Sequence, residues 1–202
     1  MQKQALISVS DKSNLIDFAK FLMDKGYKIL STGGTFKHLQ ENGIEVTEVK
    51  EVTGFPEILD GRVKTLHPNI HGGIMARRSD QTHMQTLSEH NINPIDIVVV
   101  NLYPFFDKMN TGLTEAEMIE FIDIGGPSML RSSAKNFYDV TVITEVEDYE
   151  KVKQEIEADG QTTLETRRLL AGKVFNLTSA YDAAISSYIL NDAFPNFLES
   201  SY

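Results

Sequence analysis

The sequence contains no cysteine and no long apolar run. Without cysteine the chain has no disulfide framework, no thiolate nucleophile and no cysteine-based zinc site. No apolar run approaches the roughly 18 to 20 residues that cross a membrane, and the first run, at residues 5–9, is too short for a signal peptide. We therefore expect a cytoplasmic protein with no membrane partner.

Basic residues are too few to form a broad nucleic-acid-binding face. The formal net charge is −10, with 19 lysines and arginines against 29 aspartates and glutamates. Binding to a phosphate backbone needs a broad basic surface, so nucleic acid is not expected as a partner. The uneven placement of several cations suits a local pocket for a small anion instead: Arg62, Lys64, Arg77, Arg78, Arg131 and Lys135.

Length and composition are those of one large globular domain. With 202 residues, of which 41% are hydrophobic and 24% charged, the chain can bury a sizeable core. It has no internal repeat and no low-complexity linker. We expect a single domain over residues 1–202.

The first fifty residues alternate between strand and helix patterns. Residues 5–9 and 27–30 are short apolar runs typical of buried strands, and each is followed by a polar turn and a helix-spaced apolar stripe. This order predicts the α/β class: a three-layer domain with a parallel sheet and right-handed crossovers, whose ligands bind beyond the carboxyl ends of the strands. Further strands are expected at residues 45–49, 95–100 and 138–143, and helices at residues 84–90, from 114, from 128, at 145–159 and from 163.

Two polar turns stand where strands end, at residues 10–13 and 32–35. Each offers hydroxyls and backbone N–H groups at the start of a helix, where the helix dipole favours an anion. Neither turn is a P-loop or a dinucleotide-binding glycine motif, and ordinary helix capping would explain each turn alone. Their shared position at strand ends predicts a phosphate site.

The stretch at residues 61–73 has the composition of a site, with two cations, two imidazoles and a hydroxyl between glycines. The alternative is a basic loop satisfied by nearby carboxylates. A zinc site on His67 and His71 is not expected, because no glutamate supplies the metalloprotease pattern and no third ligand stands out. Since Pro68 opposes a helix there and residues 53–78 show little periodicity, we expect an ordered, irregular active-site loop.

Two further candidates follow the strand at residues 95–100. Asn101 and Tyr103 come directly after it, so they should face the same cleft as the two polar turns. The alternative for Tyr103 is a half-buried tyrosine with its hydroxyl at the surface.

A carboxylate and two cations surround a glycine pair near residue 125. Asp123 precedes Gly125 and Gly126, which leave backbone donors free at the start of a helix, and Arg131 and Lys135 follow on one face of that helix. An anionic ligand or Asp123 would offset the repulsion between the two cations. The alternative is a solvated basic face, but the free donors favour a functional interpretation.

No chemistry is expected in the last third of the chain. Residues 145–159 are rich in carboxylates and predict an exposed helix. The apolar spacing from residue 163 onward predicts a long amphipathic helix that serves packing or a dimer surface.

Six segments, taken together and in this order, resemble one enzyme family. They lie at residues 10–12, 32–35, 61–68, 101–105, 123–126 and 134–136. The family is the inosine monophosphate (IMP) cyclohydrolase domain, the N-terminal part of the bifunctional purine-biosynthesis enzymes that also carry an AICAR formyltransferase. The resemblance covers nearly the whole chain and implies a methylglyoxal-synthase-like α/β fold. It also implies ring closure, in which the carboxamide nitrogen of formyl-AICAR attacks the formyl carbon and water leaves to give IMP.

The formyltransferase domain that follows in this family is absent from the sequence, so we expect these residues to lack that activity. A homodimer is compatible with the long C-terminal helix.

The resemblance and the reaction suggest a role for each candidate. We hypothesise that Asp123 takes the nucleophile's proton, that Lys135 transfers a proton to or from the formyl oxygen, and that Tyr103 orients the base. Lys64 and nearby backbone N–H groups would stabilise negative charge on that oxygen. No metal or redox cofactor is required. The substrate-binding candidates are Ser10, Asp11, Lys12, Thr32, Gly33, Gly34, Thr35, Arg62, Thr65, His67, Asn101, Ile124 and Gly125.

Two other functions are alternatives. A phosphate-eliminating lyase of the methylglyoxal-synthase kind would share the fold and the phosphate turn, but would not need a nucleotide-sized pocket. An IMP-binding regulatory module, resembling the effector domain of carbamoyl phosphate synthetase, would bind the nucleotide without turnover.

Overall fold

Five short strands form one parallel sheet. In a computed structural model, which describes residues 2–102, 105–108 and 111–190, their order is β3-β2-β1-β4-β5. Every neighbouring pair is parallel, so the predicted α/β class and parallel sheet are confirmed. The strands are β1 (Gln4–Ser8), β2 (Lys28–Ser31), β3 (Val46–Glu48), β4 (Ile97–Val100) and β5 (Thr141–Ile143).

The central strands are buried on both faces. Ala5 of β1 pairs with Ile29 on one side and with Ile97 on the other, and Ile97 pairs in turn with Thr141. All four residues of β4 are buried. Parallel strands joined by helices are covered on both sides, which explains why this apolar run does not alternate with polar residues.

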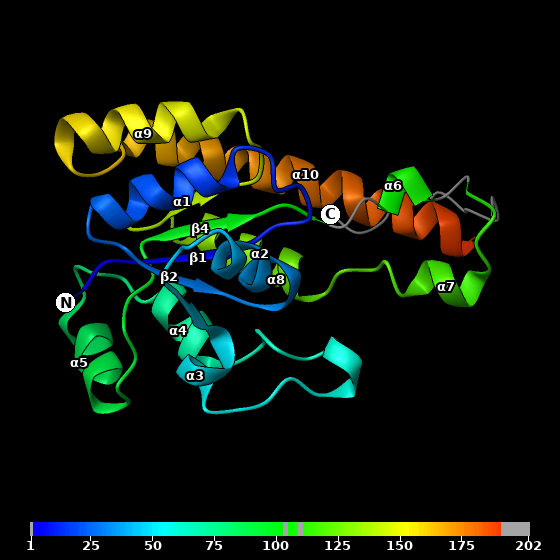
Figure 1. Cartoon of the computed structure of the whole chain (residues 1–202), viewed down its shortest axis with the longest axis horizontal. Coiled ribbons are helices and arrows are strands. Elements are labelled where there is room, and N and C mark those ends of the chain that lie inside the picture. The colour runs from blue at the N-terminus through cyan, green and yellow to red at the C-terminus, as the bar shows by residue number, and fades with distance from the viewer. Residues whose placement is uncertain (1, 103–104, 109–110, 191–202) are drawn as a thin grey trace, which may run out of the picture.

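Helices cover both faces of the sheet (Figure 1). On one face lie α1 (Leu15–Asp24) and α9 (Asp148–Asp159), where the ring of Phe18 stacks on a tyrosine ring of α9 with 4.3 Å between centroids. On the opposite face, α4 (Pro68–Met75) packs against α8 (Gly125–Lys135). The predicted three-layer arrangement is therefore confirmed.

The long helix predicted near the C-terminus is α10 (Leu164–Leu190). It packs along α8 and against β5, and it also contacts α6 (Phe105–Lys108). Within the described ranges, no helix is both long enough and apolar enough to cross a membrane.

The smaller elements complete the layers. α2 (Gly33–Glu41) packs against β1, β2 and β3. The other short helices are α3 (Val49–Thr53), the 3-10 turn η1 (Leu59–Gly61), α5 (Gln81–Glu89) and α7 (Glu115–Ile119).

Residues 53–78, expected as one irregular loop, contain a helix. α4 begins at Pro68, and His67 caps it, because the ring Nδ1 accepts a hydrogen bond from the backbone N–H of Asn69 at 3.1 Å. The expectation that Pro68 excludes a helix was wrong. Proline suits the first helical position, where its missing N–H costs nothing and its fixed φ is already helical.

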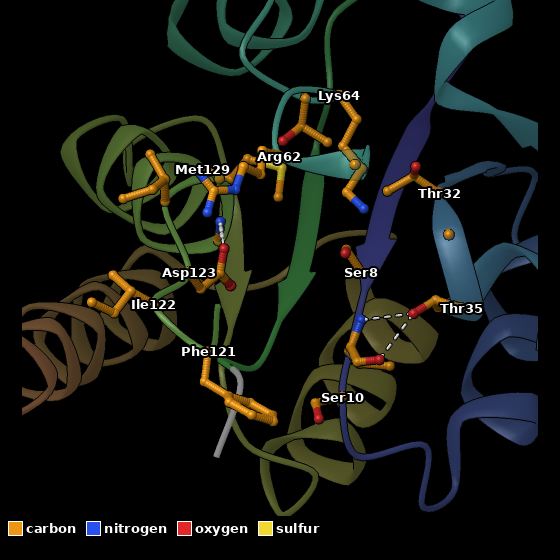
Figure 2. Close-up of a pocket in the computed structure, with 18 of the residues that line it drawn as sticks. Ser8, Ser10, Thr32, Thr35, Arg62, Lys64, Phe121, Ile122, Asp123 and Met129 are labelled. Carbon is orange, nitrogen blue, oxygen red and sulfur yellow. Dashed lines mark hydrogen bonds between the residues drawn. The ribbon is translucent and has the colours of Figure 1, made fainter. Parts of the chain in front are cut away.

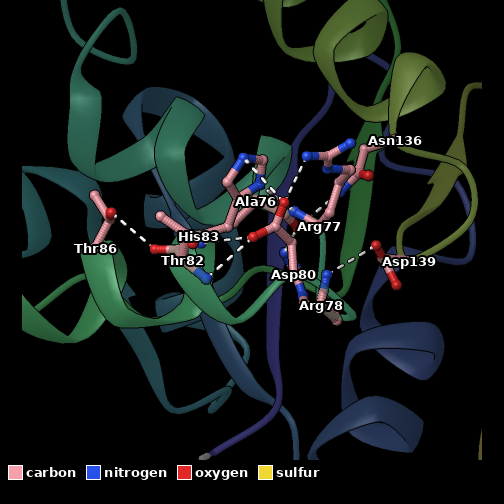
Figure 3. A network of polar contacts seen from close by, with 9 residues as sticks. All are labelled: Ala76, Arg77, Arg78, Asp80, Thr82, His83, Thr86, Asn136 and Asp139. Carbon is pink, nitrogen blue, oxygen red and sulfur yellow. Dashed lines mark hydrogen bonds and ion pairs between the residues drawn. The ribbon is translucent and has the colours of Figure 1, made fainter.

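A largely buried arginine joins several segments at the amino-terminal edge of the sheet. The guanidinium of Arg78 donates to the carbonyls of Gly73 at 3.0 Å and Ile95 at 2.8 Å. It also donates to the carbonyl of Ala76, while the carboxylate of Asp139 accepts the backbone N–H of Arg78 at 3.0 Å (Figure 3). Arg78 therefore holds the fold together at the edge opposite to the carboxyl ends of the strands.

Candidate active site

A cleft of about 690 Å³ opens at the carboxyl ends of β1, β2 and β4 (Figure 2). Its walls are the turns after these strands, the loop that contains η1, and the segment leading into α8. Small-molecule sites commonly measure about 300 to 1,000 Å³, so the cleft has room for a nucleotide. The predicted site residues that line it are Ser10, Lys12, Thr32, Gly33, Gly34, Thr35, Arg62, Lys64, Thr65, Asn101, Asp123, Ile124 and Gly125.

The turn after β1 is held by the side chain of Asn101. Its Oδ1 accepts the backbone N–H groups of Ser10 at 2.6 Å and Asp11 at 3.0 Å, and its amide donates to the carbonyl of Asp11 at 3.3 Å. The carboxylate of Asp11 accepts the N–H of Ser13 at 2.9 Å, and hydrogen bonds from Ser13 lower the pKa of Asp11. Asp11 therefore shapes the turn and does not line the cleft, whereas Ser10 and Lys12 do.

The turn after β2 presents the start of α2 to the cleft. Gly33 has a left-handed backbone, φ 57°, which glycine adopts without steric cost. The first N–H groups of the helix have no helical partners and suit an anion. The hydroxyl of Thr35, in contrast, accepts the N–H of Val9 at 3.0 Å and donates to its carbonyl at 2.9 Å. Thr35 therefore joins α2 to β1, and Thr32, Gly33 and Gly34 are left for a ligand.

The loop between α3 and α4 approaches this turn through a strained bend. Leu59 and Asp60 both have left-handed backbones, φ 54° and 53°, which cost a residue with a side chain about 1–2 kcal/mol each. Beyond the bend, the amine of Lys64 lies 3.8 Å from Oε2 of Glu57. The same amine lies 3.8 Å from the position that a Cβ on Gly33 would take, so Lys64 is next to the turn after β2. This turn and the turn after β1, both predicted to bind phosphate, are called the phosphate-type turns below.

Arg62, predicted to bind the nucleotide, is paired with a carboxylate of its own chain. Its Nε donates to Oε2 of Glu120 at 3.2 Å, and a second guanidinium nitrogen contacts Oε1. Both side chains are mostly exposed and line the cleft. The pair joins the η1 loop to the end of α7, and an anionic ligand at Arg62 would compete with Glu120 for the guanidinium.

Thr65 and Gly125 meet where α8 begins. A Cβ on Gly125 would lie only 2.8 Å from the hydroxyl oxygen of Thr65, so a side chain at this position would clash. Thr65 is buried, and its contact with this backbone keeps the η1 loop close to the first turn of α8.

Asp123 is the predicted catalytic carboxylate, and it lines the cleft together with Asp60 and Glu120. Its Oδ1 accepts the backbone N–H of Gly126 at 2.8 Å (Figure 2). Burial raises the pKa of Asp123 above its ordinary value, although hydrogen bonds from Gly126 and Gly125 and the positive charge of Lys64 act in the opposite direction. A buried carboxylate with a raised pKa in a cleft, near an ammonium group, is a candidate for general acid–base catalysis.

Besides Asp11, two candidates are not brought into this cleft, namely His67 and Lys135. His67 caps α4 and is not a lining residue. Lys135 is exposed at the last position of α8, about 15 Å along the helix from Gly125 at 1.5 Å per residue. The helical spacing placed Lys135 on one face with Arg131 but said nothing of its distance from the cleft. Tyr103 lies outside the described residues.

Sequence reasoning missed Tyr181, which was assigned to a packing helix. Its hydroxyl accepts the backbone N–H of Asp123 at 2.9 Å and donates to the carbonyl of Phe121 at 3.0 Å. In the sequence, Tyr181 is one member of the apolar stripe of α10, and nothing in that spacing distinguishes it from its neighbours.

Two family models match the chain. One, described as an MGS-like domain, matches residues 14–128, and the other, described as the AICARFT/IMPCHase bienzyme, matches residues 133–202. The first therefore covers the turn after β2 and the start of α8 but begins beyond the turn at residues 10–13, and the second covers α9 and α10.

Curated relatives are similar over the whole chain. The chain is 61% identical to the bifunctional purine biosynthesis protein PurH of Fusobacterium nucleatum and 59% identical to that of Clostridium acetobutylicum, each over 202 residues. It spans about two fifths of the length of these relatives. A crystal structure of ForH superposes with a TM-score of 0.82 at 33% identity, covering 94% of this chain and 100% of ForH.

Proposed function

The chain belongs to the family of MGS-like domains, and we propose that it is an IMP cyclohydrolase. It would close the ring of formyl-AICAR to IMP, with loss of water, in purine biosynthesis. The observation that carries the proposal is that Asp123 and Lys64 share one nucleotide-sized cleft with two phosphate-type turns. The 61% identity to PurH over the whole chain supports the same activity.

The reaction needs the groups that this cleft offers. A neutral carboxamide is a poor nucleophile and hydroxide is a poor leaving group. Ring closure therefore requires a base near the amide, a proton donor near the formyl oxygen, and donors that stabilise negative charge on that oxygen.

In this mechanism Asp123 takes a proton from the carboxamide nitrogen. Its raised pKa makes it a stronger base than an exposed aspartate, because a base becomes more effective as its pKa approaches the working pH. Lys64 and the backbone N–H of Ile124 stabilise the charge on the formyl oxygen, whereas the N–H of Gly125, also a candidate donor, already bonds the Asp123 carboxylate. These donors belong to a loop end and a helix start, which are held together where Thr65 meets Gly125.

The two turns after β1 and β2 bind the ribose phosphate. Ser10 and Lys12 come from the first turn and Thr32, Gly33 and Gly34 from the second, and all five line the cleft. The N-terminus of α2, with its unpaired N–H groups, supplies the favourable end of a helix dipole.

We further propose a homodimer, in which Lys135 acts on a substrate in the cleft of a second copy. Lys135 is exposed at the end of α8 and does not line its own cleft. Exposed apolar side chains near the end of α8 and on α10 support an interface there: Tyr138, Leu169 and Phe175 are 61%, 63% and 43% exposed. Mixing Lys135→Ala with Asp123→Asn subunits should restore activity that neither variant has alone, and failure of the mixture would remove this role.

Other parts of the proposal rest on the resemblance. Tyr103 would orient the base. Residues 1–202 would constitute the cyclohydrolase domain, with formyltransferase activity belonging to other parts of the bifunctional relatives. The cytoplasm is the proposed location, as expected of a purine-biosynthesis enzyme.

Incubation of the purified chain with formyl-AICAR, followed by the absorbance change of ring closure, tests the function. Formation of IMP above the rate of a protein-free blank excludes a binding module that lacks turnover. Inactivity, combined with release of methylglyoxal from dihydroxyacetone phosphate, would instead identify a phosphate lyase.

A further inference from the structure

The hydroxyl of Tyr181 holds the backbone that carries Asp123. It accepts the N–H of Asp123 at 2.9 Å and donates to the carbonyl of Phe121 at 3.0 Å. A single hydroxyl thus pairs with the peptide groups on both sides of Ile122, in the segment between α7 and α8. A buried N–H or carbonyl that loses its partner costs about 1–3 kcal/mol, so this segment depends on Tyr181 for its conformation.

The ring of Tyr181 is itself fixed by packing. It is 1% exposed and belongs to a small apolar cluster with Phe105 and Met118. The ring packs edge-on against Phe105, with 6.1 Å between centroids, and against Phe106, with 6.5 Å. Because neighbouring rings hold the tyrosine in place, its hydroxyl is a rigid anchor.

The Asp123 residue is therefore fixed at two points. Its carboxylate is bonded to the N–H of Gly126 at the start of α8, and its backbone N–H is bonded to Tyr181 of α10. Tyr181 is not among the residues that line the cleft, so it reaches the reaction only through the segment at residues 121–123. Displacement of a reacting group by about 1 Å can lower the rate about 10²-fold.

We propose that Tyr181 is a positioning residue for ring closure, whose hydroxyl sets the backbone at residues 121–123 and so aims the Asp123 carboxylate at the substrate. This inference rests on the proposed cyclohydrolase function. Tyr181 lies outside the region matched as an MGS-like domain, residues 14–128, and inside the region matched as the bienzyme, residues 133–202. The helix after the MGS-like part thus supplies the anchor for a carboxylate within it.

The test compares Tyr181→Phe with Tyr188→Phe in the full chain. Both changes remove one hydroxyl from the same aromatic cluster, since Tyr188 also packs edge-on against Phe105, with 5.7 Å between centroids. Tyr181→Phe should lower kcat about 10- to 100-fold while KM for formyl-AICAR changes less than about threefold, because the phosphate turns are untouched. Tyr188→Phe should change neither constant by more than about twofold.

Amide hydrogen exchange gives a readout that does not depend on turnover. The N–H of Asp123 should exchange faster in Tyr181→Phe than in the unmodified chain, with β1 and β4 still protected. An unchanged kcat, or a loss of kcat matched in Tyr188→Phe, would overturn the proposal. If the unmodified chain closes no ring, the proposed function fails, and amide exchange alone then tests whether Tyr181 anchors this backbone. Faster exchange at the N–H of Asp123 in Tyr181→Phe than in the unmodified chain would support the anchor, and equal exchange would overturn it.

Discussion

Replacing Asp123 by asparagine separates the charge of the catalytic carboxylate from its shape. Asparagine keeps an oxygen that can accept the N–H of Gly126, which bonds Oδ1 at 2.8 Å in the unmodified protein. It also fills nearly the same volume, so the start of α8 should stay in place. What the substitution removes is the negative charge and, with it, the ability to take a proton.

The expected loss of activity follows from that change. General base catalysis typically contributes about 10²- to 10⁴-fold, so kcat should fall by this factor, equivalent to about 3–5 kcal/mol of transition-state stabilisation. KM should change little, because the turns proposed to bind the phosphate lie elsewhere in the cleft. In the unmodified protein, kcat should fall on the acid side at a pH above the ordinary carboxyl range, since burial raises the pKa of Asp123.

The same substitution should stabilise the fold. A carboxyl group whose pKa is raised on folding destabilises the native state once it ionises, and this penalty is absent below the unfolded value of 3.8 and complete above the raised value. The melting temperature of Asp123→Asn should therefore exceed that of the unmodified chain at pH 7, and the difference should shrink as the pH falls from the raised pKa toward 3.8 and be absent below it.

Steady-state kinetics and thermal melts at matched pH check both parts. A kcat within about threefold of the unmodified protein would refute the role of Asp123 as the base. A lower melting temperature at pH 7 would refute the argument that its charge is buried at a cost.

Three further substitutions test other parts of the structure. Arg62→Ala should raise KM about 3- to 10-fold with little change in kcat, because the proposed role of Arg62 is to bind the substrate and its guanidinium is shared with Glu120. A variant whose main defect is a lower kcat would contradict this role. Arg78→Ala should lower the free energy of unfolding in urea by about 2–4 kcal/mol, because three backbone carbonyls lose a buried donor; a change below about 0.5 kcal/mol would contradict the network. His71 bonds the hydroxyl of Ser132 at 3.1 Å, and burial lowers its pKa below the ordinary value of 6.5. The unmodified protein should therefore lose free energy of unfolding as the pH falls below 6.5, and His71→Gln should lose less. Parallel curves of unfolding free energy against pH for the two proteins would contradict this.

Much of the site followed from the sequence because parallel strands end at one edge of a sheet. The short apolar runs at residues 5–9, 27–30 and 95–100 contain neighbouring strands of the predicted parallel sheet, so the residues after them converge on the same cleft. Asp123 could be placed there too, since the two glycines after it start a helix.

The use of individual polar groups was not readable from the sequence. Thr35 and Asn101 lie at the cleft as expected, but their side chains bond the backbone of the turn after β1. Spacing shows which residues are near a strand end, and only the folded geometry shows which hydrogen-bonding groups are already occupied.

Distances across the fold were also beyond the sequence. Lys135 stands ten residues after Gly125 on the same helix, and that length separates it from the cleft. Tyr181 is far from Asp123 in the chain, and the two meet only because α10 packs along α8. An apolar stripe predicts that a tyrosine is buried, but it does not predict the partner of its hydroxyl.

The rate of ring closure on formyl-AICAR by the purified 202-residue chain, compared with a protein-free blank, tests the central claim most directly. If the chain is an IMP cyclohydrolase that uses Asp123 as its base, IMP should form saturably at a rate that exceeds the blank, is inhibited competitively by IMP, and falls about 10²- to 10⁴-fold in Asp123→Asn. A rate equal to the blank, or one unaffected by that substitution, would contradict the account.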